Sequence, residues 1–237
     1  MISFMIQTYF LYFTISHTFI LIFNKIFMVI WIFQTGEPLF IDKKKYRPMR
    51  AMSLAKFFSK RGHYVNIISS NFFHQEKVFR KKNLKEFKFN KYININLINS
   101  SGYKKNISLA RFFDHLILSF NLLIYLFKQK SKPDFAIVGY PPAEFAFVAS
   151  WWLKLNKVRF AIDIKDLWPM NFKNYNNSLL KYLFIFYKNP LDKSISKSSF
   201  LITISKGFLN FLRKQLKNNK EIFVLPLISY NKNEKYK

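Results

Sequence analysis

Residues 28–39 read MVIWIFQTGEPL, and this stretch decides the fold. Residues 28–33 are continuously apolar, which predicts a strand that is buried on both faces. The chain then leaves the strand through Gly36, where a backbone without a Cβ atom lets amide groups approach a phosphate. A buried strand followed by a glycine turn and a helix is the pattern of a parallel α/β sheet.

The same alternation continues along the chain. Further strands are expected at residues 64–69, 92–98, 135–139, 158–164, 200–205 and 222–227, and helices at residues 47–60, 108–128, 142–156, 178–198 and 207–217. Residues 92–98 alternate with period two, which predicts an edge or half-exposed strand. Each of the five glycines is expected at a boundary between a strand and a helix. The fold class predicted is α/β: a doubly wound, mostly parallel Rossmann-like sheet that binds ligands beyond the carboxyl ends of its strands.

The composition fits one domain on the cytosolic side. The chain has 237 residues, 50% of them hydrophobic, and no cysteine, which excludes disulfides, thiolate catalysis and cysteine-ligated metals. Its formal charge of +27 favours polyanionic partners, namely nucleic acid, anionic lipid or diphosphates. Lysine, phenylalanine, isoleucine and asparagine are all abundant, as in AT-rich coding sequences, and we assign roughly half of the charge excess to that bias.

The two ends of the chain differ from the middle. Residues 1–27 form an apolar segment with no charged residue before Asn24, and two interpretations stay open: a membrane anchor or a start-site artefact with Met28 as the true start. Residues 28–228 are predicted to be the Rossmann-like domain. Residues 229–237 are expected to be a disordered tail.

The first candidate site follows the first strand. Gly36 and Glu37 leave that strand, and Arg47 and Arg50 stand near the start of the next helix, where the helix dipole favours anions. The simpler interpretation is that Gly36 only makes a turn and both arginines are solvated. No P-loop or GxGxxG pattern is present.

The second candidate site ends the strand within residues 158–169, VRFAIDIKDLWP. This strand delivers Asp163, Lys165 and Asp166 to its carboxyl end, and two acids and a base are useful there for proton transfer. The simpler interpretation makes Asp166 a turn or cap residue and Asp163 a hydrogen-bond partner of nearby amides. The spacing is not that of a metal site, so no metal is expected. His74, in a predicted loop with polar neighbours, either contacts a ligand or is an ordinary surface residue.

Several short motifs occur together in a known order: GEP (36–38), YRPMR (46–50), KRGH (60–63), FHQEK (73–77), DIKDLWP (163–169) and ITISKG (202–207). In this order they resemble the N-terminal domain of family 4 glycosyltransferases over about residues 28–228. The resemblance implies a GT-B fold, in which two Rossmann-like domains face a cleft. It also implies that the N-terminal domain mainly binds the acceptor, that the C-terminal domain binds the nucleotide-sugar, and that transfer needs no metal or cofactor.

The sequence departs from that family at two points. Many members have a histidine before Asp-Leu-Trp-Pro, where this chain has Lys165, so a role based on histidine does not carry over. The chain also stops after VLPLI (224–228), where the family crosses into its C-terminal domain with the donor-binding glutamate pair. The donor half is therefore expected to be missing.

These observations predict the acceptor-binding domain of a glycosyltransferase that is inactive alone. Asp163 and Asp166 are predicted to be catalytic, and donor-phosphate or acceptor contacts are predicted at Gly36, Glu37, Arg47, Arg50, His74 and Lys165. By resemblance, Gly36 would lie beside the donor phosphates. The substrates expected are a nucleotide-sugar and a glycan or polyprenyl-linked acceptor, at the cytoplasmic face of a membrane.

Two alternatives stay open for the function. The chain is either a membrane-attached subunit that recruits a separate donor-binding chain or, ranked low, a basic nucleic-acid-binding protein, for which no RRM, KH or helix-turn-helix pattern is evident. Contact with a membrane surface is also expected. The helix at residues 108–128 is either core-facing or, because of its lysine-rich borders, an interfacial element that binds anionic lipid.

Overall fold

The protein is described by a computed structural model for residues 27–42, 48–80, 85–106, 108–166, 178–215 and 220–226, and in residues 178–187 for the backbone only. Within these residues, one sheet contains eight strands in the order β10-β9-β8-β7-β1-β2-β6-β5. They are β1 (Val29–Phe33), β2 (Tyr64–Ser70), β5 (Glu86–Lys88), β6 (Ile93–Ile98), β7 (Phe135–Tyr140), β8 (Arg159–Ile164), β9 (Phe200–Thr203) and β10 (Ile222–Val224). All neighbouring strands are parallel except β5 and β6.

The strand order reverses next to β1. From β1 the chain builds outward through β2 to β6, and then crosses back to place β7 on the other side of β1, followed by β8, β9 and β10. The carboxyl ends of β1 and β7 therefore flank a topological switch point, which is where open α/β sheets bind ligands. The doubly wound, mostly parallel α/β fold predicted from the sequence is confirmed.

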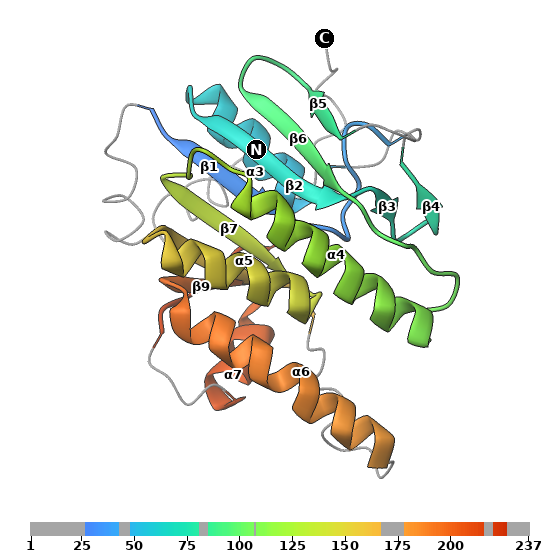
Figure 1. Ribbon diagram of the computed structural model, residues 1–237. Helices are drawn as coiled ribbons and strands as arrows, with labels where there is room; N and C mark the ends of the chain where they lie inside the picture. Colours follow the sequence, from blue (N-terminus) through green and yellow to red (C-terminus); the bar gives the residue numbers. More distant parts are fainter. Residues whose placement is uncertain are drawn as a thin grey trace, which may run out of the picture.

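Helices cover the two faces of the sheet. On one face lie α4 (Leu109–Phe127), α5 (Ala143–Leu155) and α6 (Ser178–Lys197), and on the other lies α3 (Arg50–Lys60) (Figure 1). The helix α7 (Lys206–Gln215) joins β9 to β10, and its Leu212 packs with the α5 side of the core. A short hairpin of β3 (Phe72–Phe73) and β4 (Val78–Phe79) stands apart from the main sheet.

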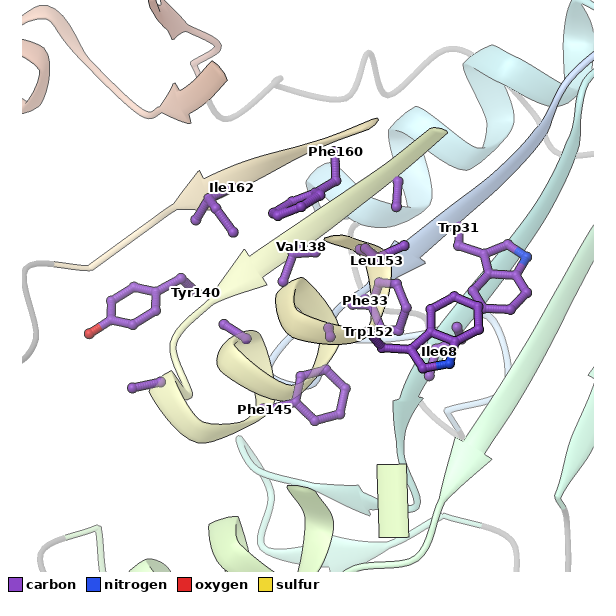
Figure 2. Close-up of a cluster of buried hydrophobic side chains, with 14 of the residues drawn as sticks. Trp31, Phe33, Ile68, Val138, Tyr140, Phe145, Trp152, Leu153, Phe160 and Ile162 are labelled. Atoms are coloured by element: carbon purple, nitrogen blue, oxygen red, sulfur yellow. The ribbon is translucent and has the colours of Figure 1, made fainter. Parts of the chain in front are cut away.

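Alternating side chains of β1 pack into two hydrophobic cores, one on each face of the sheet. Trp31 and Phe33 point to the α5 side, whereas Ile30 and Ile32 point to the α3 side, and all four side chains are buried. Figure 2 shows the first of these cores between β1, β7, β8 and α5, where the indole rings of Trp31 and Trp152 stack with centroids 5.5 Å apart. Burial on both faces is the physical reason why these strands read as continuous apolar runs.

Most predicted elements are confirmed within one to three residues of their ends. The helix predicted at residues 108–128 is α4, and the Ser108 hydroxyl caps it by accepting a hydrogen bond from the Arg111 amide at 3.2 Å. The helix predicted from residue 47 begins instead at Arg50, because Pro48 and Met49 precede it in a non-helical conformation. The β3–β4 hairpin and β5 were not predicted.

Two other sequence expectations are wrong. The edge alternative for residues 92–98 is wrong, because β6 pairs with β2 on one side and with β5 on the other, whereas the half-exposed alternative is confirmed, since Asn94 and Asn96 are half-buried between buried neighbours. Gly139 does not mark a boundary, since it lies inside β7 and pairs with Asp163 of β8. The predicted apolar segment (1–27), apart from Phe27, and the predicted tail (229–237) lie outside the described residues.

Candidate functional site

Charged side chains gather at the carboxyl ends of β1 and β8. The ammonium of Lys165, just past β8, contacts the carboxylate of Glu37, which follows β1. The same ammonium lies 3.2 Å from Asp163 Oδ2 and donates a hydrogen bond to Gln34 Oε1 at 3.1 Å. The Gly36–Glu37 turn and Asp163 thus lie at one rim of the sheet, as the parallel arrangement predicts.

Arg50 completes this group from the start of α3. Its guanidinium pairs with the Asp163 carboxylate and also donates to the carbonyl of Leu225, which follows β10. Its side chain is fully buried, so the interpretation that Arg50 is solvated is wrong. The "rim cluster" of Arg50, Lys165, Glu37 and Asp163 holds two cations and two carboxylates, and this balance allows four charges to stay inside the protein.

Glu37 also caps α3. The residue before the helix, Met49, makes no side-chain cap, but Glu37 Oε2 accepts a hydrogen bond from the Ala51 amide at 2.8 Å. A carboxylate at a helix N-terminus is favoured by the unpaired amides and by the helix dipole. The position where the sequence predicts a ligand anion therefore holds an anion of the protein itself.

The two glycines of the switch point have different surroundings. A Cβ atom on Gly139 would lie 1.8 Å from Gln34 Oε1 and 3.0 Å from the carbonyl oxygen of Phe33. Glycine at this position lets Gln34 cross β7 and reach Lys165. Among the described residues, the atom nearest to a Cβ atom on Gly36 would be Gln34 Nε2 at 3.9 Å, so none of them crowds this side of the Gly36 backbone.

Arg80 is a site residue that sequence reasoning missed. Its side chain is buried, with Nε donating to Asp42 Oδ1 at 2.7 Å and Nη2 donating to the Glu37 carbonyl at 3.0 Å. A further bond runs from Nη1 to the carbonyl of Ser70 at 2.7 Å. Arg80 thus ties the turn after β1 to the end of β2. An isolated arginine after a short hairpin gives no signal of this role.

His74 belongs to a second polar group beside the rim. Its Nδ1 contacts the hydroxyl of Tyr103 and lies 2.9 Å from Lys77 Nζ. Burial, together with the neighbouring cations Lys77 and Arg111, lowers the pKa of His74 to about 4, so its imidazole is neutral at pH 7. The next residue, Gln75, donates to the Gly36 carbonyl at 3.2 Å, which places this group next to the rim cluster.

A second neutral histidine, His115 of α4, adjoins this group through the ring of Tyr103. Burial, with Arg111 as the next cause, lowers the pKa of His115 to about 3. His115 Nδ1 lies 3.8 Å from Glu144 Oε2, so this contact involves an uncharged imidazole at neutral pH. Burial also raises the pKa of Tyr103 to about 12, which keeps its hydroxyl protonated.

The predicted site residues differ in their accessibility. In the rim cluster, 15% of the Lys165 side chain is exposed, whereas the other three side chains are at most 3% exposed. Asp166 follows Lys165 and is exposed. Arg47 lies outside the described residues. Among the described residues, no group of three or more histidine, aspartate and glutamate side chains is arranged to hold a metal ion.

No protein-family model matches the sequence, and no curated protein matches it. Among solved structures, a sucrose-phosphate synthase from Thermosynechococcus elongatus matches with a TM-score of 0.55 at 9% identity, over 84% of this chain and 47% of that chain. A second structure of that enzyme matches with a TM-score of 0.51 at 9% identity, over 86% of this chain and 90% of that chain. The catalytic domain of starch synthase IV from Arabidopsis thaliana, bound to ADP and acarbose, has a TM-score of 0.49 at 14% identity, over 83% and 51% of the two chains.

The likeness is one of fold. This chain spans about half the length of the first sucrose-phosphate synthase structure, at 47% of that chain. Both proteins share an α/β domain with a central, mostly parallel sheet. The chain therefore has the Rossmann-like fold of GT-B glycosyltransferases.

Proposed function

We propose that this chain is the acceptor-side, N-terminal type of domain of a family 4 glycosyltransferase. Its substrates are a nucleotide-sugar and a lipid-linked or cell-surface glycan precursor, and it works at the cytoplasmic face of a membrane. It uses no metal and no cofactor, with the nucleotide-sugar as co-substrate. It belongs to polysaccharide biosynthesis and does not turn over without a donor-binding domain.

The rim cluster is the observation that carries this proposal. It lies at the switch point of the sheet, where Lys165 is the accessible member and no described residue crowds one side of the Gly36 backbone. A phosphate oxygen that reaches Gly36 competes with Glu37 for the ammonium of Lys165. Lysine binds phosphate as a point charge, so a positive charge at this position can hold the phosphate group of a lipid-linked acceptor.

The acids of this rim take different roles in the proposal. Asp163 is held between Arg50 and Lys165, and it keeps both cations in place. Asp166 is exposed at the end of the same strand, where a carboxylate can accept the proton of an acceptor hydroxyl. Arg47 and His74 are proposed as further contacts of the donor phosphates or the acceptor.

One domain supplies one wall of such a site. Sugar transfer requires the anomeric carbon to be held near the acceptor oxygen, while the diphosphate is stabilised from the other side. The chain matches about half of a complete glycosyltransferase chain, at 47% of its length. We therefore expect no transfer by this polypeptide alone with UDP-, ADP- or GDP-sugars.

A second form of the proposal is that a separate chain supplies the donor-binding half. Affinity purification of the full chain after chemical crosslinking should then recover a second Rossmann-like protein. Adding that protein should give transfer that neither chain shows alone. Turnover by this polypeptide alone would contradict both forms.

Acceptor binding is tested by titrating the full chain with a polyprenyl diphosphate in detergent micelles. Lys165→Ala should weaken binding by about tenfold or more, because one charge-assisted contact is lost. Lys165→Arg should restore part of it, and Lys60→Ala, the same charge change at an exposed position on α3, should have no effect. Equal binding by the Lys165→Ala and wild-type chains, with both folded, would contradict the role of Lys165 in acceptor binding.

A further inference from the structure

The helix α4 presents an apolar face to solvent. Every exposed residue of this helix is apolar: Leu109, Ala110, Phe113, Leu116, Ile117, Phe120, Ile124 and Phe127. The exposed fractions reach 77% at Leu109, 62% at Phe120 and 65% at Phe127. These positions recur roughly every three or four residues, so they form one continuous stripe along the helix. We call this stripe the α4 face.

Composition does not explain the α4 face. The chain has 39 lysines and arginines, and the surface helix α7, for comparison, exposes Lys206, Asn210, Arg213 and Lys214. None of the exposed positions of α4 carries a charged side chain; of its two charged residues, Arg111 is partly buried and Asp114 is buried. An exposed apolar surface of this length on a soluble domain marks a contact with another apolar phase or partner.

The surface continues from α4 onto the end of α5. The ring of Phe127 meets Trp151 edge-on, with centroids 6.2 Å apart, and Leu155 is 60% exposed. Trp151 is partly buried. Tryptophan side chains are enriched where protein meets the headgroup region of a membrane, because the ring is apolar and its N–H is polar.

Lysines border the α4 face at both ends. Lys104 and Lys105 are exposed before the helix, and Lys128, Lys130 and Lys132 are exposed after it. Two copies of this chain that met through the α4 face would bring these lysines together, each copy carrying +27 overall. An anionic bilayer is complementary to this arrangement, since its headgroups pair with the lysines while its acyl region takes the apolar stripe.

The burial of one side of α4 argues against a membrane-spanning orientation. By length and composition α4 is apolar enough to span a bilayer, but one third (33%) of that window is buried in the domain. Leu118, Leu122 and Leu126 on its inner side pack into the core of the sheet. A spanning orientation would expose the sheet itself to lipid, where the unpaired polar groups of loops and strand edges are costly.

We infer that the α4 face is the membrane-binding surface of this protein, with the helix lying parallel to an anionic bilayer and its stripe in the headgroup–acyl boundary. This inference rests on the proposed function in taking a bilayer as the partner. Because α4 follows the carboxyl end of β6, it begins on the rim side of the sheet (Figure 1), and His115 near its start meets the ring of Tyr103, which contacts His74. A lipid-linked acceptor in the bilayer would thus have its phosphate near the rim.

The absence of cysteine makes a direct test simple. A single cysteine is introduced in the full chain by Phe120→Cys, and a polarity-sensitive fluorophore is attached to it. The matched control is Phe57→Cys, because Phe57 is also an exposed phenylalanine (36%) on a helix, but α3 lies on the other side of the sheet (Figure 1). Vesicles of phosphatidylcholine mixed with phosphatidylglycerol are compared with vesicles of phosphatidylcholine alone.

The expected result is a blue shift at position 120 with the mixed vesicles, none at position 57, and a decrease of binding with added salt. If the chain floats with the vesicles while the label at position 120 stays in water, another segment such as residues 1–26 holds it, and the inference is wrong. The assay contains no sugar donor or acceptor, so its failure does not bear on acceptor binding. Conversely, a chain that binds vesicles but not polyprenyl diphosphate disproves the proposed function alone.

A second experiment uses the variant Phe113→Gln/Phe120→Gln in vesicle flotation. It should reduce binding to the mixed vesicles by about tenfold or more, because two aromatic side chains no longer enter the acyl boundary. The control Phe57→Gln should bind as the wild type does. Urea unfolding verifies that all three chains are folded. Unchanged flotation of the double variant overturns the inference. The inference is also wrong if the wild-type chain is a dimer and the double variant is a monomer that floats as the wild type does.

Discussion

The ammonium of Lys165 contacts the carboxylate of Glu37, although 128 positions separate the two residues. Lys165 stands at the end of β8, and Glu37 stands in the turn after β1, with β7 between those strands. This ion pair therefore bridges the switch point. It also connects α3 to β8, because Glu37 caps the first turn of that helix.

The first prediction concerns this ion pair. Lys165→Met should lower the free energy of unfolding by about 2 to 4 kcal/mol, because it leaves the buried carboxylate of Glu37 without its cation. In a double-mutant cycle with Glu37→Gln, the coupling energy should be about 1 to 3 kcal/mol. Urea unfolding followed by circular dichroism measures each term. A coupling energy near zero, with the four proteins equally well folded, would show that the pair does not hold the switch point together.

The second prediction compares two glycines. Gly139→Ala should destabilise the protein by about 1 to 3 kcal/mol, since its Cβ atom would collide with Gln34 and push it away from Lys165. Gly36→Ala should leave the stability within about 0.5 kcal/mol, because the nearest atom of the described residues, Gln34 Nε2, would lie 3.9 Å from its Cβ atom. The same Gly36→Ala chain should bind polyprenyl diphosphate or UDP-sugars more weakly. Thermal unfolding and titration calorimetry separate the two effects, and equal stability of the two variants would contradict the argument.

The third prediction concerns Arg80. Arg80→Ala should cost about 3 to 5 kcal/mol of unfolding free energy, because Asp42 and two backbone carbonyls lose a buried donor. Arg80→Lys should recover little of it, since one ammonium does not reproduce the planar fork of a guanidinium.

The matched control is Arg61→Ala, an exposed arginine whose guanidinium lies 3.7 Å from the ring centroid of Phe57. It should cost no more than about 1 kcal/mol. Chemical unfolding of the three variants gives the comparison. If Arg80→Lys is as stable as the wild type, the turn after β1 does not depend on the bidentate geometry.

The fourth prediction is a loss of stability in mild acid. The pKa of His74 is lowered from 6.5 to about 4, so the unfolded chain binds a proton more readily than the folded one. The stabilisation is complete above pH 6.5 and is lost as the pH falls toward 4, by about 2 to 3 kcal/mol for this histidine. His74→Gln should flatten the dependence of stability on pH in this window. Urea midpoints at several pH values test this, and identical profiles for the two chains would contradict it.

The sequence predicted the framework well because its strands are buried on both faces. β7 and residues 160–162 of β8 are apolar and buried, as expected for strands of a covered sheet, and the helices between the strands have clear ends. The short strands β4 and β5 gave no such signal, since their side chains are mostly exposed. The period-two pattern of β6 arises from asparagines that bond to neighbouring strands and not from a position at the edge of the sheet. Asn94 donates a hydrogen bond to Glu86 at 2.7 Å, and Asn96 donates one to Asn66.

The location of the candidate site was predictable from the sequence, but the contacts between its side chains were not. Strand ends of a parallel sheet meet at one rim, so Glu37 and Asp163 were expected to be near each other. Nothing in the sequence indicates that Arg50 turns inward to Asp163, because a helix start gives the position of a side chain and not its direction. Likewise, the contact between Gln34 and Gly139 depends on the distance between neighbouring strands and leaves no motif.

The bond from Arg50 to the Leu225 carbonyl has a mechanical consequence. The same guanidinium holds Asp163, so one side chain connects the backbone after β10 to the charged rim. A displacement of the backbone at Leu225 would therefore leave one nitrogen of a fully buried guanidinium without its acceptor, at a cost of about 1 to 3 kcal/mol. The position of the chain just after β10 and the charged rim are thus energetically connected through the side chain of Arg50.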